Sequence, residues 1–265
     1  MLVWTKSGMA VVLTVFALVV TVVFVAPIAT VIAAALAGSW TGPLPSNLGL
    51  DNFRQALSEE DAASLSVSLQ TALLAGGFAL LLGTWAALAA AQVPPWCRRL
   101  TDAVFHLPVA VPSVAIGLGV LIAFNERPLL LGGTKWIVIL AHTVLVLAYA
   151  FSGVSAALDR LDPGYRQAAQ SLGAGPIRVL FQVTLPLLLP ALGAAAGLSI
   201  ALSMGELGAT IMVYPATWRT LPVTIFGQTD RGELFRAAAG TTVLVLITLV
   251  SLVVLGRVKS RAVLR

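Results

Sequence analysis

The sequence predicts an all-α integral membrane protein with six transmembrane helices in a single domain, residues 1–265. Of these 265 residues, 58% are hydrophobic and only 10% are charged, whereas soluble domains have about 25% charged residues. The apolar stretches are continuous and do not alternate with polar residues. This pattern favours membrane-spanning helices over the strands of a membrane barrel.

Six apolar stretches account for most of the chain. The predicted spans cover about 9–37, 67–91, 107–124, 135–158, 186–213 and 237–256. The first is longer than a signal-peptide core of about 7–15 residues, so we expect it to be an uncleaved span. Pro108 and Pro112 are expected to break or kink the start of the third span, which membrane helices tolerate inside a bundle. Gly193 and Gly197 allow a close crossing of the fifth span with a neighbouring helix.

The distribution of Lys and Arg predicts which side of the membrane each loop faces. Ten of the sixteen basic residues lie in the two termini and in the loops 92–106 and 159–185, and six lie in the other three loops. Short loops rich in Lys and Arg remain in the cytoplasm. We therefore expect both termini and the loop 159–185 to be cytoplasmic.

Several classes of function are excluded by what the sequence lacks. A single cysteine, Cys97, cannot form an internal disulfide or a cysteine metal cluster, and His106 and His142 lie far apart in the sequence. The net charge of +5 reflects the loops and the tail, and no nucleic-acid-binding motif accompanies it. The chain has no Gly-x-x-x-x-Gly-Lys-Ser/Thr phosphate loop. We expect no catalytic residue and no metal site, and no ATP hydrolysis by this chain.

The loop 159–185 is the longest polar interruption in the second half of the chain. Asp162 can cap a helix and Pro163 can occupy its first position. Gly173 suits the C-terminal end of that helix. Pro176 can then begin a second short helix, which Pro186 is expected to end or kink.

The same loop carries a spaced motif. The motif consists of Gln167–Ala169, three intervening residues, Gly173, nine intervening residues and Val183–Pro186. This spacing resembles the signature loop of the membrane subunits of binding-protein-dependent ABC importers of type I. That loop has Glu-Ala-Ala, Gly and Ile-x-Leu-Pro at these positions, so Gln167 and Val183 depart from it. The loss of the Glu charge puts in doubt an ion pair at Gln167, but not the docking of the helix.

The resemblance implies how the loop works and what it binds. In this family a short cytoplasmic helix, the coupling helix, docks on a separate ATPase subunit that binds ATP and Mg, so this chain needs no cofactor. The residues expected to make this contact are Tyr165, Arg166, Gln167, Ala168, Ala169 and Gly173. Small Ala residues allow close approach, and Arg166 and Gln167 offer polar contacts at the rim. The family further implies a location in the inner membrane. It implies a second permease subunit, identical or different, and the first span is expected to wrap around this partner. An extracytoplasmic solute-binding protein is expected to deliver the substrate.

Glu206 is the only acidic residue well inside a predicted span. Such a residue lines a path or gate, or forms a structural hydrogen bond, and both interpretations stay open. The segment Gly205–Thr210 resembles the molybdate, sulfate and phosphonate branch of these permeases. The longer stretch 205–239 resembles most the 2-aminoethylphosphonate group. Because like charges repel, a lone carboxylate would not hold an oxyanion, unless the substrate also carries an ammonium group. Sulfate, molybdate, thiamine and ferric iron remain possible substrates.

Two other functions fit this sequence less well. An intramembrane serine protease of the rhomboid type needs a histidine base within reach of its serine. Ser152 is a candidate nucleophile, but His142 lies on the same helix, about 15 Å away by helical rise, and the sixth span has no histidine. A secondary transporter is disfavoured because the halves of the chain show no obvious repeat. We expect His142 to be a hydrogen-bonded interior residue, His106 to lie at the membrane interface, and Arg219 to be a solvated loop residue or a contact for the binding protein.

Overall fold

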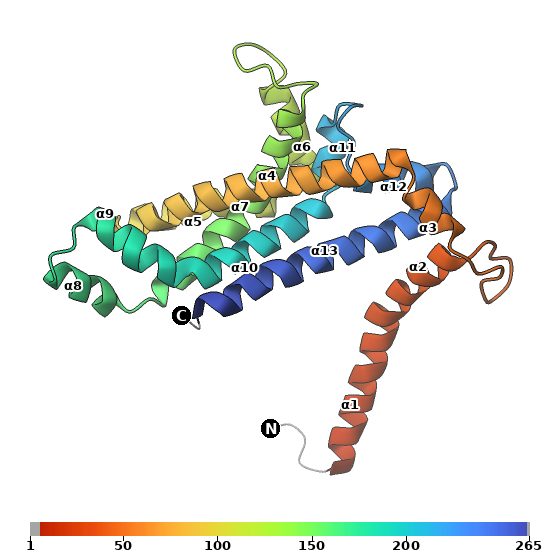
Figure 1. Cartoon of the computed structure of the whole chain (residues 1–265), viewed down its shortest axis with the longest axis horizontal. Helices are drawn as coiled ribbons and strands as arrows, with labels where there is room; N and C mark the ends of the chain where they lie inside the picture. Colours follow the sequence, from red (N-terminus) through yellow and green to blue (C-terminus); the bar gives the residue numbers. More distant parts are fainter. Residues whose placement is uncertain (1–5, 264–265) are drawn as a thin grey trace. The chain divides into compact units, whose positions relative to one another are not determined.

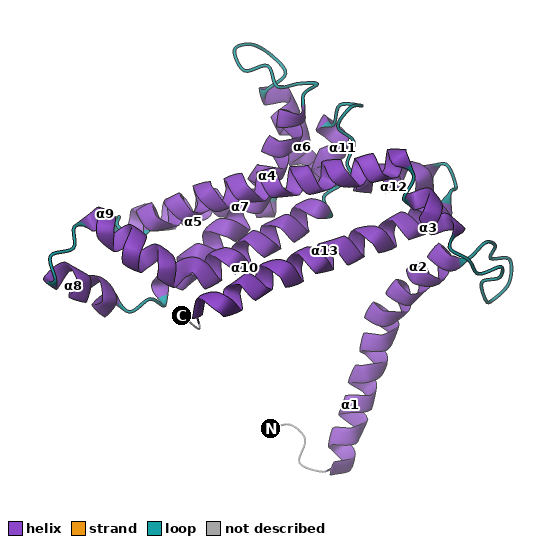
Figure 2. Cartoon of the chain, in the orientation of Figure 1, coloured by secondary structure: helices purple, strands orange, loops and turns teal. Residues whose placement is uncertain are grey.

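The computed structural model describes residues 6–263, which form helices, turns and loops without a β-strand (Figure 2). Within this range five helical stretches are long and apolar enough to cross a membrane. They are Gly8–Leu36, Glu59–Ala90, Lys135–Asp159, Pro176–Met204 and Leu234–Leu255. A sixth crossing is obtained if the bent pair Pro95–Ala110 and Ser113–Ala123 counts as one span. The all-α membrane fold expected from the sequence is thereby confirmed.

Most helices follow one another with short connections, and longer loops lie at 37–50 and 124–134 (Figure 1). Their bounds are α1 Lys6–Val20, α2 Ala26–Leu36, α3 Asp51–Ala56, α4 Glu59–Ala90, α5 Pro95–Ala110, α6 Ser113–Ala123, α7 Lys135–Asp159, α8 Pro163–Ser171, α9 Pro176–Val179, α10 Leu185–Met204, α11 Gly208–Val213, α12 Leu221–Asp230 and α13 Leu234–Val263. Two π-helical segments, η1 Thr21–Val25 and η2 Leu180–Thr184, connect α1 to α2 and α9 to α10 without a break.

The chain divides into two compact units, and the smaller consists of 6–62 with 225–243. Its apolar core is built from alanines of the three helices α2, α3 and α13: Ala35, Ala56, Ala238 and Ala239. Close to this core, the amide of Asn52 donates to the carbonyl oxygens of Ala35 and Ala37, at 3.1 and 2.7 Å. These bonds satisfy carbonyl groups that the end of α2 leaves without helical partners.

The larger unit consists of 63–224 with 244–263, and α7 is its most buried helix. Phe151 and Val154 of α7 pack with Leu188 of α10 and with the end of α4. A Cβ placed on Gly83 of α4 would lie 2.8 Å from the backbone nitrogen of Phe151. Glycine at this position therefore lets the α4 and α7 backbones approach closely, as small residues do in membrane proteins generally.

The third predicted span is a bent pair of helices. The axes of α5 and α6 differ by 105°, and the bend lies at Val111 and Pro112 (Figure 1). Proline disfavours a helical conformation in the preceding residue, and Val111 is extended (φ −103°, ψ 134°). The expected break at Pro112 is therefore present, whereas Pro108 lies inside α5 without ending it. The segment 92–106, expected to be a loop, is largely helical because α5 begins at Pro95.

The fifth span begins earlier than the sequence analysis placed it. Pro186 was expected to end or kink the preceding short helix, but α9, η2 and α10 form one helical stretch, Pro176–Met204. Proline lacks an N–H group and its ring crowds the carbonyl four residues earlier. The π-helical segment η2 lies directly in front of Pro186 and changes the hydrogen-bond spacing there. Segment η1 has the same position ahead of Pro27.

Candidate functional site

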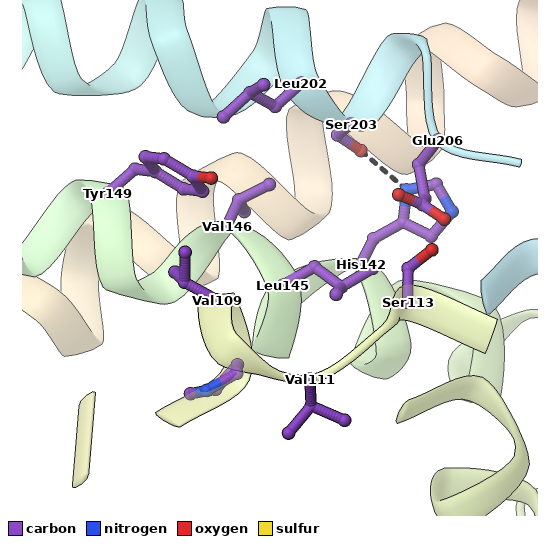
Figure 3. A pocket seen from close by; sticks show the side chains of 11 residues that line it. Val109, Val111, Ser113, His142, Leu145, Val146, Tyr149, Leu202, Ser203 and Glu206 are labelled. Atoms are coloured by element: carbon purple, nitrogen blue, oxygen red, sulfur yellow. Dashed lines mark hydrogen bonds between the residues drawn. The ribbon is translucent and has the colours of Figure 1, made fainter. Parts of the chain in front are cut away.

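A small pocket of about 210 Å³ lies in the larger unit where two interrupted helices face α7. The α5–α6 bend contributes Val111 and Ser113, α7 contributes His142 and Tyr149, and the end of α10 leads to Glu206. Figure 3 shows Glu206, His142 and Ser113 gathered at one end of the pocket and Tyr149 at the other. The volume suits a small solute, because drug-sized ligands occupy about 300–1,000 Å³.

Glu206 occupies the break between α10 and α11. Its backbone leaves the helix after Gly205, and its Oε1 accepts a hydrogen bond from the backbone N–H of Ala209 at 2.8 Å. The carboxylate thus satisfies one of the free N–H groups at the start of α11, as a capping side chain does. No hydrogen bond of Oε2 is present among the residues that the structure describes. Glu206 is half-buried and lines the pocket.

His142 connects α7 to both sides of this break. Its Nδ1 lies 2.7 Å from Ser203 Oγ on α10, and its Nε2 lies 2.8 Å from Thr210 Oγ1 on α11. The Thr210 hydroxyl donates to the carbonyl oxygen of Glu206 at 3.1 Å, so it accepts a hydrogen bond from Nε2–H. The neutral ring is therefore the Nε2–H tautomer, and Nδ1 accepts from Ser203. The expected hydrogen-bonded interior histidine is confirmed, and it also lines the pocket.

The backbones of α6 and α11 touch beside the pocket. A Cβ on Gly117 would lie 2.6 Å from the carbonyl oxygen of Ala209, and one on Gly208 would overlap Ser113 Oγ. Figure 1 shows the two short helices side by side. Both glycines thus set the distance between the two helix breaks that line the pocket.

His106 supplies a partner for Ser152 that the sequence analysis missed. Its Nε2 lies 2.8 Å from Ser152 Oγ, so a histidine of another helix, α5, does reach this serine. The carbonyl oxygen of Asp102 can only accept, so Nδ1 of the His106 ring carries the proton and Nε2 of the neutral ring is an acceptor for Ser152. The Ser152 hydroxyl has a second acceptor in the carbonyl oxygen of Ala148, at 2.6 Å. The His106 ring is held at 2.7 Å by the backbone oxygen of Asp102 rather than by a carboxylate.

The helix of the loop 159–185 is α8, and both of its ends are as predicted. Asp162 Oδ1 accepts from the N–H of Gly164 at 2.8 Å, and Pro163 occupies the first position. At the other end Gly173 has a φ of +83°, and the N–H of Ala174 donates to the carbonyl of Ala169 at 3.0 Å. These are the features of a Schellman motif, in which glycine provides the left-handed conformation.

The two faces of α8 differ. Tyr165 is 57% exposed and Leu172 is 90% exposed, and the exposed Ala168 lies between them on the same face. Gln167 is also exposed, whereas Arg166 and Ala169 are half-buried, and Arg166 lines a pocket with residues of α4. Leu172 was not among the predicted contact residues. Its position four residues after Ala168 and seven after Tyr165 puts it on the same exposed face of the helix.

Arg219 lies in the loop between α11 and α12. It is half-buried and takes part in an interaction within the chain, so it is not a freely solvated arginine. Beside it, the indole N–H of Trp218 donates to Thr71 Oγ1 at 2.9 Å, which ties this loop to α4.

The comparison with protein families gives one match that covers most of the chain. Residues 79–263 match the family described as "binding-protein-dependent transport system inner membrane component". The chain belongs to this family. It is a multi-pass inner membrane permease, a transport component of an ABC importer whose ATPase is a separate subunit. The protease interpretation finds no support in this assignment.

Relatives and solved structures agree with the family. The permease is 46% identical over 261 residues to a putative 2-aminoethylphosphonate transport system permease protein, PhnV, of Salmonella paratyphi A, with 98% of each chain covered. It is 32% identical to the molybdenum transport system permease protein ModB of Escherichia coli K12, covering 67% of this chain and 84% of ModB. A crystal structure of a bacterial ABC transporter for the acidic polysaccharide alginate has the same fold, with a TM-score of 0.75 and 16% identity over 96% of this chain and 95% of that one.

Proposed function

We propose that this permease imports 2-aminoethylphosphonate across the inner membrane. The observation that carries the substrate assignment is the similarity to PhnV over nearly the whole of both chains. The pocket is compatible with this solute because it is small and contains both a carboxylate and several hydrogen-bonding groups. The carboxylate of Glu206 can attract the ammonium group of an aminophosphonate, which a simple oxyanion such as sulfate lacks.

The pocket is proposed to be part of the translocation path. It lies at two interrupted helices, and interrupted helices expose backbone groups where membrane transporters hold their solutes. The breaks at Pro112 and Glu206 can act as the moving parts of an alternating-access cycle. Binding of ATP to the partner and of the loaded receptor to the permease would shift the balance between inward-open and outward-open states.

The exposed face of α8 is the proposed contact with the ATPase subunit. It presents Tyr165, Ala168 and Leu172, with Gln167 beside them, and the Schellman motif at Gly173 fixes the end of the helix. Tyr165 and Leu172 lie on the same side of the helix, with the small Ala168 between them, and form an apolar face that a partner surface can cover. ATP and Mg would bind to the partner, and no cofactor is assigned to this chain.

The proposed assembly contains two permease subunits, identical or different, two ATPase subunits and an extracytoplasmic solute-binding protein. Both termini and α8 are placed in the cytoplasm because of the excess of Lys and Arg in those segments. The half-buried Arg219 and the loop that contains it would then face the binding protein.

The test is reconstitution of the permease in liposomes with its candidate ATPase and receptor. Substrate-stimulated ATP hydrolysis and uptake would be measured with 2-aminoethylphosphonate, phosphate, sulfate, molybdate, thiamine and ferric iron. We expect stimulation by 2-aminoethylphosphonate alone. Stimulation by another solute would overturn the substrate assignment and keep the importer. Absence of a complex, also after addition of a second permease, would overturn the proposed contact of α8.

A further inference from the structure

A groove runs along α4 in the larger unit, beginning beneath α8. It consists of two neighbouring pockets, each of about 400 Å³, which meet at Trp85 and Leu88 because both residues line both pockets. The first pocket includes Arg166 and Gln170 of α8. The second contains mainly apolar side chains of α4, η2 and α10 and extends to Gly77. The groove thus has one polar end and one apolar end.

The apolar part has the length of one membrane leaflet. From Leu88 to Gly77 the helix rises by about 16 Å at about 1.5 Å per residue. Half of a hydrocarbon core of about 30 Å is about 15 Å. Because α4 is one of the membrane-crossing helices, this part of the groove is at the depth of lipid acyl chains.

The polar end carries an uncompensated positive charge. Within residues 8–255 the Arg166 guanidinium forms no ion pair, although it is half-buried. The nearby acidic residues of this loop are engaged elsewhere, since Asp159 pairs with Arg98 at 2.6 Å and Asp162 caps α8. A half-buried cation at the membrane surface favours an anionic group in the groove.

We propose that this groove binds an anionic glycerophospholipid. The headgroup phosphate contacts Arg166 and Gln170, and an acyl chain lies along Leu88 and Trp85 towards Gly77. The lipid would connect α8 to α4, so the position of α8 depends on the membrane lipid. This site is separate from the pocket at Glu206 and does not rest on the proposed substrate.

The experiment is native mass spectrometry of the full-length chain, extracted in a mild detergent that contains equal amounts of phosphatidylglycerol and phosphatidylcholine. Gly77→Leu fills the apolar end, because a Cβ on Gly77 has no atom within 4 Å and the fold can accept it. Gly119→Leu is its control, since Gly119 is equally open but lies on α6 outside the groove. Arg166→Gln tests the headgroup contact, and Arg160→Gln, in the same loop but outside the groove, is the control.

We expect one retained phosphatidylglycerol in the unaltered chain, and a loss of about fivefold in Arg166→Gln, the effect of one basic residue near a membrane surface. Gly77→Leu should lose the lipid, and both controls should keep it. Equal retention in all four variants, or no retained lipid in any, would overturn the site. Equal retention of both lipids with no effect of Arg166→Gln would overturn the anionic headgroup. If a second permease subunit displaces the lipid from the assembled importer, the groove is a protein interface and the proposal is wrong.

Discussion

The imidazole of His142 and the hydroxyl of Thr210 join α7 to the start of α11 through a hydrogen bond of 2.8 Å. This hydrogen bond and the one from Ser203 place the buried imidazole of His142 at the centre of the helix break that carries Glu206. The break has no regular helical hydrogen bonds of its own at Gly205 and Glu206, so its geometry depends on such contacts.

Replacement of His142 should therefore disturb the break. In His142→Phe the hydroxyls of Ser203 and Thr210 lose their buried partner, and we expect a loss of about 1–3 kcal/mol in the free energy of unfolding. The amide nitrogen of His142→Gln can reach the position of Nε2 and keep the bond to Thr210, whereas the shorter His142→Asn cannot. Uptake should accordingly be better preserved in the Gln variant than in the Asn variant. Equal uptake by both would contradict the importance of the Thr210 bond.

Glu206→Gln separates the charge of Glu206 from its structural hydrogen bond. The amide oxygen of Gln can still accept from the N–H of Ala209, so the start of α11 should remain intact. Removal of the negative charge should lower uptake of 2-aminoethylphosphonate by about tenfold, equivalent to about 1.4 kcal/mol, while assembly with the ATPase is unchanged. Glu206→Ala, which also removes the cap, serves as the comparison. Uptake at the original rate in the Gln variant would leave only the structural role.

A charge on the exposed face of α8 should block ATPase binding. Ala168→Glu and Leu172→Asp each place a carboxylate in a contact that has to exclude water, and an unpaired charge there is costly. The control is Leu44→Asp, because Leu44 is also an exposed leucine but lies in the loop between α2 and α3. The measurement is copurification of the ATPase. Retention of the ATPase by Leu172→Asp would remove this residue from the contact surface.

Much of this architecture follows from local sequence patterns. Hydropathy alone identified the long spans, and Asp162, Pro163 and Gly173 determined the ends of α8, because caps and glycine conformations depend on neighbouring residues. The contact between His142 and Ser203 joins residues 61 positions apart. It depends on how two helices are rotated against each other, which one sequence does not determine.

The helix α5 could have been found from the sequence. Arg98, Asp102 and His106 recur every four residues and so lie on one helical face. That face points to α7, where Arg98 pairs with Asp159 and His106 contacts Ser152. The two arginines of this segment suggested a loop only because they interrupt an apolar sequence. The π-helical segments had no such signal, because they arise from the fit of Pro27 and Pro186 into a continuous helix.

The ion pair between Asp61 and Arg236 should be important for stability of the smaller unit. Asp61 is only 2% exposed, and it accepts hydrogen bonds from Arg236 at 3.1 Å and from the amide of Gln228 at 3.0 and 3.2 Å. Asp61→Ala leaves the buried amide of Gln228 without its acceptor and removes the buried partner of Arg236, which keeps only the weaker pair with Glu233 at 3.4 Å. The expected loss is about 3 kcal/mol in mixed-micelle unfolding. Asp51→Ala, which removes the exposed pair with Arg54, is the control and should change little. A small effect of Asp61→Ala would mean that water replaces the carboxylate.

Gly117 should tolerate no side chain, whereas Gly119 on the same helix should. In Gly117→Ala the new methyl group would lie 2.6 Å from the carbonyl oxygen of Ala209, a separation that real side chains do not adopt. Helices α6 and α11 must then move apart, which displaces Ser113 and Glu206 at the pocket. We expect a lower unfolding temperature and reduced uptake, with a cost of about 1–3 kcal/mol for overpacking. Gly119→Ala adds the same methyl group where no atom lies within 4 Å, so uptake should be unchanged, and stability should be equal or slightly higher because helix propensity favours alanine. Equal effects of the two substitutions would show that the close contact of α6 with α11 does not control the pocket.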